Sequence, residues 1–241
     1  MANKHVSNVV NLITKMGEHT GPQTAFRDFC EMYALALYNG CTLQNKAWQE
    51  RENRYLTLIK QYNAKAIPEI TAELTWAFEE EPFVDHLGNI YMQAYTGNKQ
   101  LGQVFTPTSV CKLMAEVVLP EPPKNGEQHS LMEPCCGGGA LIIAFLEQCM
   151  LKGYNYQKYL KIYASDLDSL CVHMTYIQLS LLGARAIVKH EDSIAIKEYS
   201  HFITPMEMLR LDYFLAADTK QQEPAPTQNL PQPEKGQLLL F

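Results

Sequence analysis

The stretch with the most potential for chemistry runs from Glu133 to Gly139. An apolar segment ends there in an acidic residue and a proline, followed by two cysteines and three consecutive glycines, and a second apolar run begins at Ala140. This order is typical of a strand, a tight turn and the start of a helix, where glycines let the backbone approach a ligand and free N–H groups can bind it. A nucleotide-like ligand is one interpretation, and glycines that serve packing alone are the other.

Acidic residues at the ends of the next two apolar segments could complete such a site. Asp166 and Asp168 follow the segment 161–165, and Asp192 follows the segment 186–190. An acidic residue at the tip of the second strand is the expected partner for ribose hydroxyls in a nucleotide site. The alternative is that Asp166 or Asp168 only caps the next helix.

The elements that must position these residues follow from apolar periodicity. Residues 1–95 predict a helical N-terminal region, whose aromatic residues we expect in a helix-bundle core. In residues 96–218, a helix over 110–118 should have Thr106 as its cap and Pro107 in its first turn. Strands and helices then alternate, which predicts a parallel sheet with helices on both faces.

The pattern changes after the third predicted strand. From Ile194 to Asp218 we expect no further strand, and Thr204-Pro205 is a candidate start for one more helix. Residues 219–241 begin with a stretch rich in Gln, Pro, Glu and Lys without apolar periodicity. Such a composition predicts a disordered tail, which here ends in an apolar pentapeptide.

Composition narrows the class of protein. The 241 residues include seven cysteines, two of them adjacent, and carry a formal net charge of −6. The odd cysteine count argues against a disulfide framework, so we expect a cytoplasmic protein, and no spacing of Cys and His predicts a metal site. No segment predicts a signal peptide or a membrane span. Because the net charge is negative, a broad basic surface for DNA is not expected. Any contact with DNA must therefore be local or supplied by a partner.

Three motifs in order resemble a known family, and the first is the helix over residues 87–92 with the turn Gly97-Asn98-Lys99. Gly102-Gln103-Val104-Phe105-Thr106-Pro107 matches a Gly-Gln-x-aromatic-Thr-Pro motif, and Glu133-Pro134-Cys135-Cys136-Gly137-Gly138-Gly139 matches an Asp-Pro-Cys-Cys-Gly-Ser-Gly motif with Glu in place of Asp. In this order they resemble the N-6 adenine-specific DNA methyltransferases, in the branch of type I restriction modification subunits. The resemblance covers roughly residues 82–193. It implies the Rossmann-like α/β fold of S-adenosylmethionine-dependent methyltransferases, with a partial sheet and a helical N-terminal region.

The resemblance also implies roles for individual residues. Phe105, Thr106 and Pro107 should face the methionine end of S-adenosyl-L-methionine, and Glu133 should accept a hydrogen bond from its ammonium group. The turn itself, with Cys135, Gly137 and Gly139, should let the cofactor lie close to the backbone. Asp166 should bind the ribose hydroxyls, Leu167 should pack on the adenine, and Asp192 should accept from the adenine amine or, alternatively, cap a local turn.

The acceptor half of the family pattern is missing. The family places an Asn, Asp or Ser before Pro-Pro and an aromatic residue, to hold the target amine and stack on the flipped base. The only Pro-Pro pair here is Pro122-Pro123, upstream of the glycine turn and without an aromatic residue. The catalytic residues are therefore unknown. Three interpretations remain: an enzyme with a diverged acceptor site or one completed by a partner methyltransferase or specificity subunit, an inactive binding protein, or a truncated remnant.

The C-terminal pentapeptide offers a partner. Residues 237–241 resemble the peptide with which many bacterial proteins bind the sliding clamp of the replication machinery, and the residues concerned are Gln237, Leu238, Leu240 and Phe241. A disordered tether that presents apolar anchors to a pocket would hold the protein close to DNA. A chance apolar end and a tail docked on its own domain are the alternatives.

Overall fold

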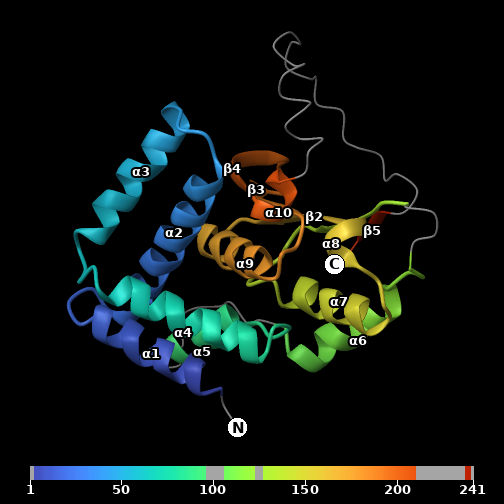
Figure 1. Cartoon of the computed structure of the whole chain (residues 1–241), viewed down its shortest axis with the longest axis horizontal. Coiled ribbons are helices and arrows are strands. Elements are labelled where there is room, and N and C mark those ends of the chain that lie inside the picture. The colour runs from blue at the N-terminus through green and yellow to red at the C-terminus, as the bar shows by residue number, and fades with distance from the viewer. Residues whose placement is uncertain (1–2, 96–105, 123–126, 210–236, 240–241) are drawn as a thin grey trace.

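The structure is a computed structural model that describes residues 3–95, 106–122, 127–209 and 237–239. Its N-terminal region is helical, as predicted (Figure 1). The helices are α1 (Lys4–Met16), α2 (Pro22–Cys41), α3 (Lys46–Ile59), α4 (Ala66–Glu80) and α5 (His86–Tyr95). Phe26, Phe29, Phe78 and Tyr91 are buried between these helices. These four aromatic residues belong to the core, as their helical spacing indicates. The prediction is wrong for Trp76, which is 55% exposed, and Trp48, Tyr55 and Tyr62 are only partly buried.

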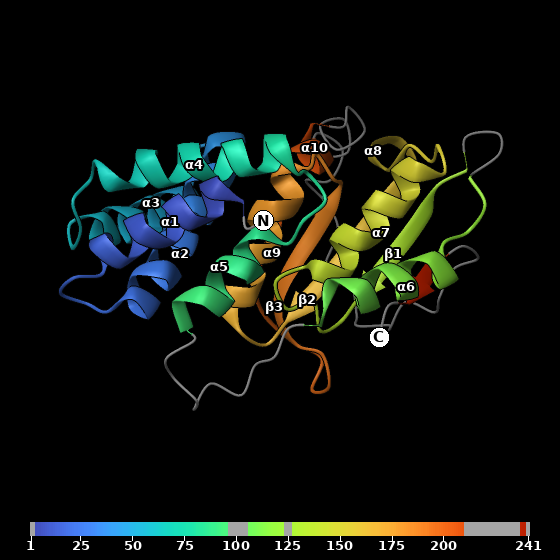
Figure 2. The ribbon, with the colours of Figure 1, turned by 90° about the horizontal axis from the view of Figure 1, so that it is seen from below.

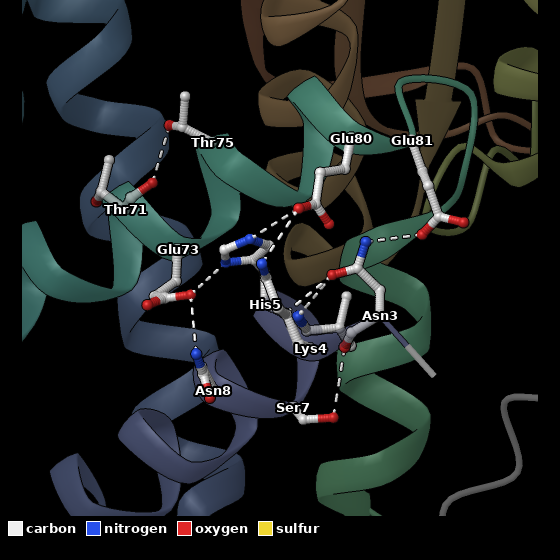
Figure 3. Close-up of polar contacts among 11 residues, drawn as sticks. Asn3, Lys4, His5, Ser7, Asn8, Thr71, Glu73, Thr75, Glu80 and Glu81 are labelled. Atoms are coloured by element: carbon white, nitrogen blue, oxygen red, sulfur yellow. Dashed lines mark hydrogen bonds and ion pairs between the residues drawn. The ribbon is translucent and has the colours of Figure 1, made fainter. Parts of the chain in front are cut away.

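A polar cluster holds the first helix against the fourth (Figure 3). The side chain of Asn3 caps α1 by accepting from the N–H of His5 at 2.9 Å. The His5 ring lies 2.6 Å from a carboxylate oxygen of Glu73 and 3.3 Å from one of Glu80, both on α4. The Asn8 amide donates to the same Glu73 carboxylate at 3.1 Å. These contacts fix the start of the chain on the helical region.

The second part of the chain is an α/β unit. It contains α6 (Thr108–Val118), β1 (His129–Glu133), α7 (Ala140–Leu151), α8 (Tyr156–Tyr159), β2 (Leu160–Asp166), α9 (Ser169–Leu181), β3 (Ala186–Asp192), β4 (Lys197–Ile203), α10 (Pro205–Met208) and β5 (Gln237–Leu239). The sheet order is β4-β3-β2-β1-β5. β1, β2, β3 and β5 are parallel, whereas β4 is antiparallel to β3.

The prediction of helices on both faces is wrong for the crossover helices of this sheet. α7 joins β1 to β2 and α9 joins β2 to β3, and both lie on the same face (Figures 1 and 2). The two crossovers step in the same direction along the sheet, so right-handed connections put both helices on one side. Buried Ile162 and Ala164 of β2 alternate with half-buried Lys161 and Tyr163 on the opposite face.

The prediction of no strand after Ile194 is also wrong. β4 forms a hairpin with β3, and only its last two residues, Phe202 and Ile203, are buried. The earlier residues are polar or charged, so the alternation of a half-buried strand is absent from the sequence. The partner strand supplies the backbone hydrogen bonds instead. Pro205 does open a short helix, α10, as the sequence indicates.

The described residues contain no helix that is both long and apolar enough to cross a membrane. Within the same ranges, no group of three or more His, Cys, Asp or Glu side chains is arranged to hold a metal ion. All seven cysteines are free thiols.

Candidate cofactor-binding site

Three acidic residues end three neighbouring parallel strands. Glu133 is the last residue of β1, Asp166 of β2 and Asp192 of β3. Because the strands run in the same direction, their carboxyl ends meet at one edge of the sheet, where ligands bind in open α/β folds. The sequence-predicted residues of the strands and the glycine turn are therefore brought together.

The glycine turn between β1 and α7 needs its glycines. Gly137 and Gly139 have φ angles of 53° and 95°, in the left-handed region. A Cβ on Gly139 would lie 3.1 Å from the Thr175 hydroxyl oxygen of α9, so a side chain would also be crowded. The Gly137 N–H donates to the Asp166 carboxylate at 2.9 Å, and the Cys136 N–H donates to the Ser165 carbonyl at 2.9 Å. The end of β2 therefore fixes the turn.

The structure separates the two aspartates after β2. Asp168 is the N-cap of α9, because its carboxylate accepts from the Leu170 N–H at 2.9 Å, and it pairs with Arg27 of α2 at 3.2 Å. Asp166 accepts from the N–H groups of Gly137 and Asp168, at 2.9 Å each. Asp168, and not Asp166, thus caps the helix. Asp166 faces the glycine turn, and its contact with ribose stays a prediction.

Glu133 is the most unusual carboxyl of the site. The residue is 1% exposed, and its Oε1 accepts from the Cys135 N–H at 3.1 Å. Its Oε2 is buried without a hydrogen-bond partner among the described residues. Burial, with a smaller contribution from the Asp166 carboxylate, raises the pKa of Glu133 to about 7. A buried carboxylate oxygen without a partner fits a cationic donor such as an ammonium group.

Asp192 and its neighbour join the third strand to the site. The Asp192 carboxylate accepts from the N–H groups of Ile194 and Ala195, at 3.1 and 2.8 Å, so it caps the turn into β4. Its contact with an adenine amine stays a prediction beside this local role. The Ser193 hydroxyl donates to the Pro134 carbonyl at 3.0 Å and thereby ties β3 to the glycine turn.

Other predicted residues lie at the rim or outside the described residues. Leu167 is 61% exposed at the tip of β2, and Cys135 is also exposed. Phe105 lies outside the described residues, and Thr106 and Pro107 are exposed just before α6. The cap predicted at Thr106 is wrong: α6 begins at Thr108, and its N-cap is Pro107, whose carbonyl accepts from the N–H groups of Val110 and Cys111 at 2.9 and 3.1 Å.

Sequence reasoning missed the residues that support the glycine turn from behind. The Thr175 hydroxyl donates to the Gly137 carbonyl at 2.9 Å, and the Gln178 amide donates to the Gly138 carbonyl at 2.6 Å. Asp85, just before α5, accepts from the same Gln178 amide at 2.7 Å. Thr175 and Gln178 are fully buried, three residues apart on a largely apolar helix. Two polar residues on the buried face of α9 were the signal that could have revealed them.

The segment that contains this site matches a known protein family. Residues 84–216, more than half of the chain, match the family described as N-6 DNA Methylase. The chain belongs to this family. The match begins before α5, so this N-6 DNA methylase family segment reaches back into the helical region. With its partly parallel sheet and glycine turn, the chain has the Rossmann-like α/β fold of S-adenosylmethionine-dependent methyltransferases, with a partial sheet and a helical N-terminal region.

Individual relatives are similar over part of their length. A 92-residue segment is 30% identical to the type I restriction enzyme MjaIX methylase subunit of Methanocaldococcus jannaschii, and covers 38% of this chain and 15% of that subunit. A protein of Listeria monocytogenes assigned to the class I S-adenosylmethionine-dependent methyltransferases is 16% identical, with a TM-score of 0.48 and coverage of 78% of this chain and 53% of that chain. The methyltransferase subunit of a type I restriction-modification system from Streptococcus thermophilus is 11% identical, with a TM-score of 0.43 and coverage of 79% and 58%. The chain therefore spans less than two thirds of the length of each of these relatives.

The described part of the C-terminal peptide forms an outer strand of the sheet, beside β1. Gln237, Leu238 and Leu239 form β5 and pair in parallel with Ser130, Leu131 and Met132 of β1. This arrangement corresponds to the alternative in which the tail docks on its own domain. Leu240 and Phe241 lie outside the described residues, as do residues 210–236. Binding of the peptide to a sliding clamp stays a prediction.

Proposed function

We propose that this chain binds S-adenosyl-L-methionine and acts as an adenine-specific DNA methyltransferase, with the exocyclic amine of adenine in DNA as its acceptor. Membership of the N-6 DNA Methylase family supports the reaction class. The observation that carries the cofactor assignment is the buried Oε2 of Glu133 beside the glycine turn, which has no hydrogen-bond partner among the described residues. An isolated buried carboxylate is unfavourable, and the ammonium group of the cofactor's methionine end would satisfy it.

The other residues at the strand ends suit the remaining parts of the cofactor. Asp166 presents its carboxylate at the tip of β2, where it would bind the ribose hydroxyls while it holds the Gly137 N–H. Exposed Leu167 would pack on the adenine ring, and Asp192 would accept from the adenine amine. Thr106 and Pro107 would border the methionine end. Bound S-adenosylmethionine would supply an electrophilic methyl group on its sulfonium.

The cofactor assignment can be tested by isothermal titration calorimetry. S-adenosylmethionine should bind the wild-type chain, and Asp166→Ala should bind at least about tenfold more weakly, because two ribose hydrogen bonds would be lost. Asp168→Ala is a matched control, since its carboxylate caps α9 and is not assigned to the cofactor. Equal affinities for the wild type and Asp166→Ala would refute the assignment.

The methylation reaction needs a separate test. DNA from a methylation-deficient bacterium that expresses only this chain should contain N6-methyladenine above the level of the empty host. Soluble protein without the modified base would show that the chain alone is inactive. Addition of a partner methyltransferase or specificity subunit should then restore the signal if a second subunit supplies the acceptor residues.

A second function is a binding protein without catalysis. The absence from the whole sequence of the Pro-Pro-aromatic acceptor motif favours it. In that case the chain would bring its partners or DNA to the sliding clamp through residues 237–241. Deletion of these residues should abolish co-purification of the clamp, and retention of the clamp would contradict the peptide assignment. Clamp binding would also require β5 to leave β1, because the same residues pair with that strand.

A further inference from the structure

A fully hydrogen-bonded amide joins the helical N-terminal region to the glycine turn. Gln178 of α9 is 0% exposed. Its Nε2 donates to the Gly138 carbonyl at 2.6 Å and to Asp85 Oδ1 at 2.7 Å, and its Oε1 accepts from the Leu87 N–H at 3.2 Å. Both amide hydrogens and the amide oxygen are therefore used. No other uncharged side chain except asparagine could donate twice and accept once, and asparagine is shorter by one methylene.

Asp85 is held in place on both sides. The N–H of Gly88 donates to Asp85 Oδ1 at 2.8 Å, so the carboxylate also anchors the first turn of α5. A Cβ on Gly88 would collide with the same carboxylate, and a Cβ on Gly138 would lie 3.3 Å from both of its oxygens. Gly88 and Gly138 thus leave room for the Asp85 carboxylate between α5 and the glycine turn. Little room is left for the turn to shift.

These donors set the direction of the peptide groups in the turn. The Gly137 carbonyl accepts from Thr175 and the Gly138 carbonyl accepts from Gln178, so both carbonyls point back toward α9. In a trans peptide the N–H points opposite to the carbonyl, so the N–H of Gly138 points away from α9. The partly negative carbonyl oxygens are thereby kept off the face that a cofactor would approach.

We infer that Gln178 and Asp85 are positioning residues of the cofactor site: they lock the Gly138 peptide, and through them α5 of the helical region becomes part of that site. The inference rests on the proposed function for its effect on cofactor affinity. Its effect on the turn itself does not depend on a cofactor. Without the Gln178 donor, the Gly138–Gly139 peptide would keep the hydrogen bond from the Gly139 N–H to the Cys136 carbonyl at 2.8 Å but lose the one that fixes its buried carbonyl, so the turn would open more readily.

The test compares variants that remove or keep the donors and acceptors. Gln178→Leu and Asp85→Ala should weaken S-adenosylmethionine binding about tenfold in calorimetry well below the unfolding temperature. Asp85→Asn should bind as the wild type does, because the asparagine Oδ1 can accept both hydrogen bonds. Asn39→Leu is the matched control: Asn39 is a buried amide that joins α2 to Trp48, Arg51 and Glu52 of α3, away from the turn.

A second readout follows the turn in the protein without cofactor. Hydrogen exchange of the segment 134–140, measured by mass spectrometry, should become faster in Gln178→Leu and Asp85→Ala but not in Asn39→Leu. If the two variants only lower the unfolding temperature, as Asn39→Leu does, with exchange and affinity unchanged, the inference is overturned. Faster exchange in the two variants together with no S-adenosylmethionine binding in the wild type would support the positioning role and refute the proposed cofactor instead.

Discussion

Glu133 should make cofactor binding depend on pH. The pKa of its carboxyl is about 7 in the free protein, because the side chain is buried. An ammonium ligand pairs with the ionised form, which is about half of the molecules at pH 7 and about a tenth at pH 6. The dissociation constant of S-adenosylmethionine should therefore rise about fivefold from pH 7 to pH 6, a loss of about 1 kcal/mol, and further below pH 6.

Calorimetry in buffers of different ionisation enthalpy measures both the affinity and the proton released when Glu133 ionises. Glu133→Gln keeps an oxygen that can accept from the Cys135 N–H but cannot ionise, so its affinity should be lower at pH 7 and independent of pH in this range. 5′-Methylthioadenosine, which lacks the amino-acid end, should bind the wild type with no such pH dependence. A wild-type affinity that is equal at pH 6 and pH 7, or a slope that persists in Glu133→Gln, would refute the reasoning.

The same raised pKa should lower the free energy of unfolding of the free protein as pH rises from the ordinary glutamate pKa to about 7. Urea unfolding should therefore show Glu133→Gln to be more stable than the wild type at pH 8, by up to about 3 kcal/mol, with a smaller difference at pH 5, and equal stabilities at pH 8 would contradict the raised pKa. Asp168→Ala should lose about 1 kcal/mol in urea unfolding, because α9 loses its N-cap, and a loss below a few tenths would contradict that role. Glu207 is buried between Lys161 and Arg185 at 2.8 and 2.9 Å. Glu207→Ala should lose about 3–5 kcal/mol in the same assay, since Lys161 and Arg185 would both lose their carboxylate partner, and near-wild-type stability would show that these ion pairs contribute little.

Much of the fold could be read from local sequence. The helical region, the three parallel strands and the glycine turn follow from apolar periodicity and from glycines that only a turn requires. β4 could not, because its exposed polar residues carry no alternation and its hydrogen bonds come from β3. The cap predicted at Thr106 is one residue too early, because α6 begins at Thr108 and its N-cap is Pro107, which has no side-chain acceptor.

The sequence by itself determined which groups end the strands: Glu133, Asp166 and Asp192 are placed by strand length and by the parallel order of the sheet. Only the tertiary structure decided what each carboxyl does there. It made Asp168 the helix cap and buried Glu133 Oε2 where no described residue forms a hydrogen bond with it. It also brought Asp85, 93 residues away along the chain, to Gln178 behind the glycine turn. Burial and hydrogen-bond partners depend on segments distant in sequence, so a local pattern can reveal a polar residue on an apolar helix face, such as Gln178, but not the residue that it contacts.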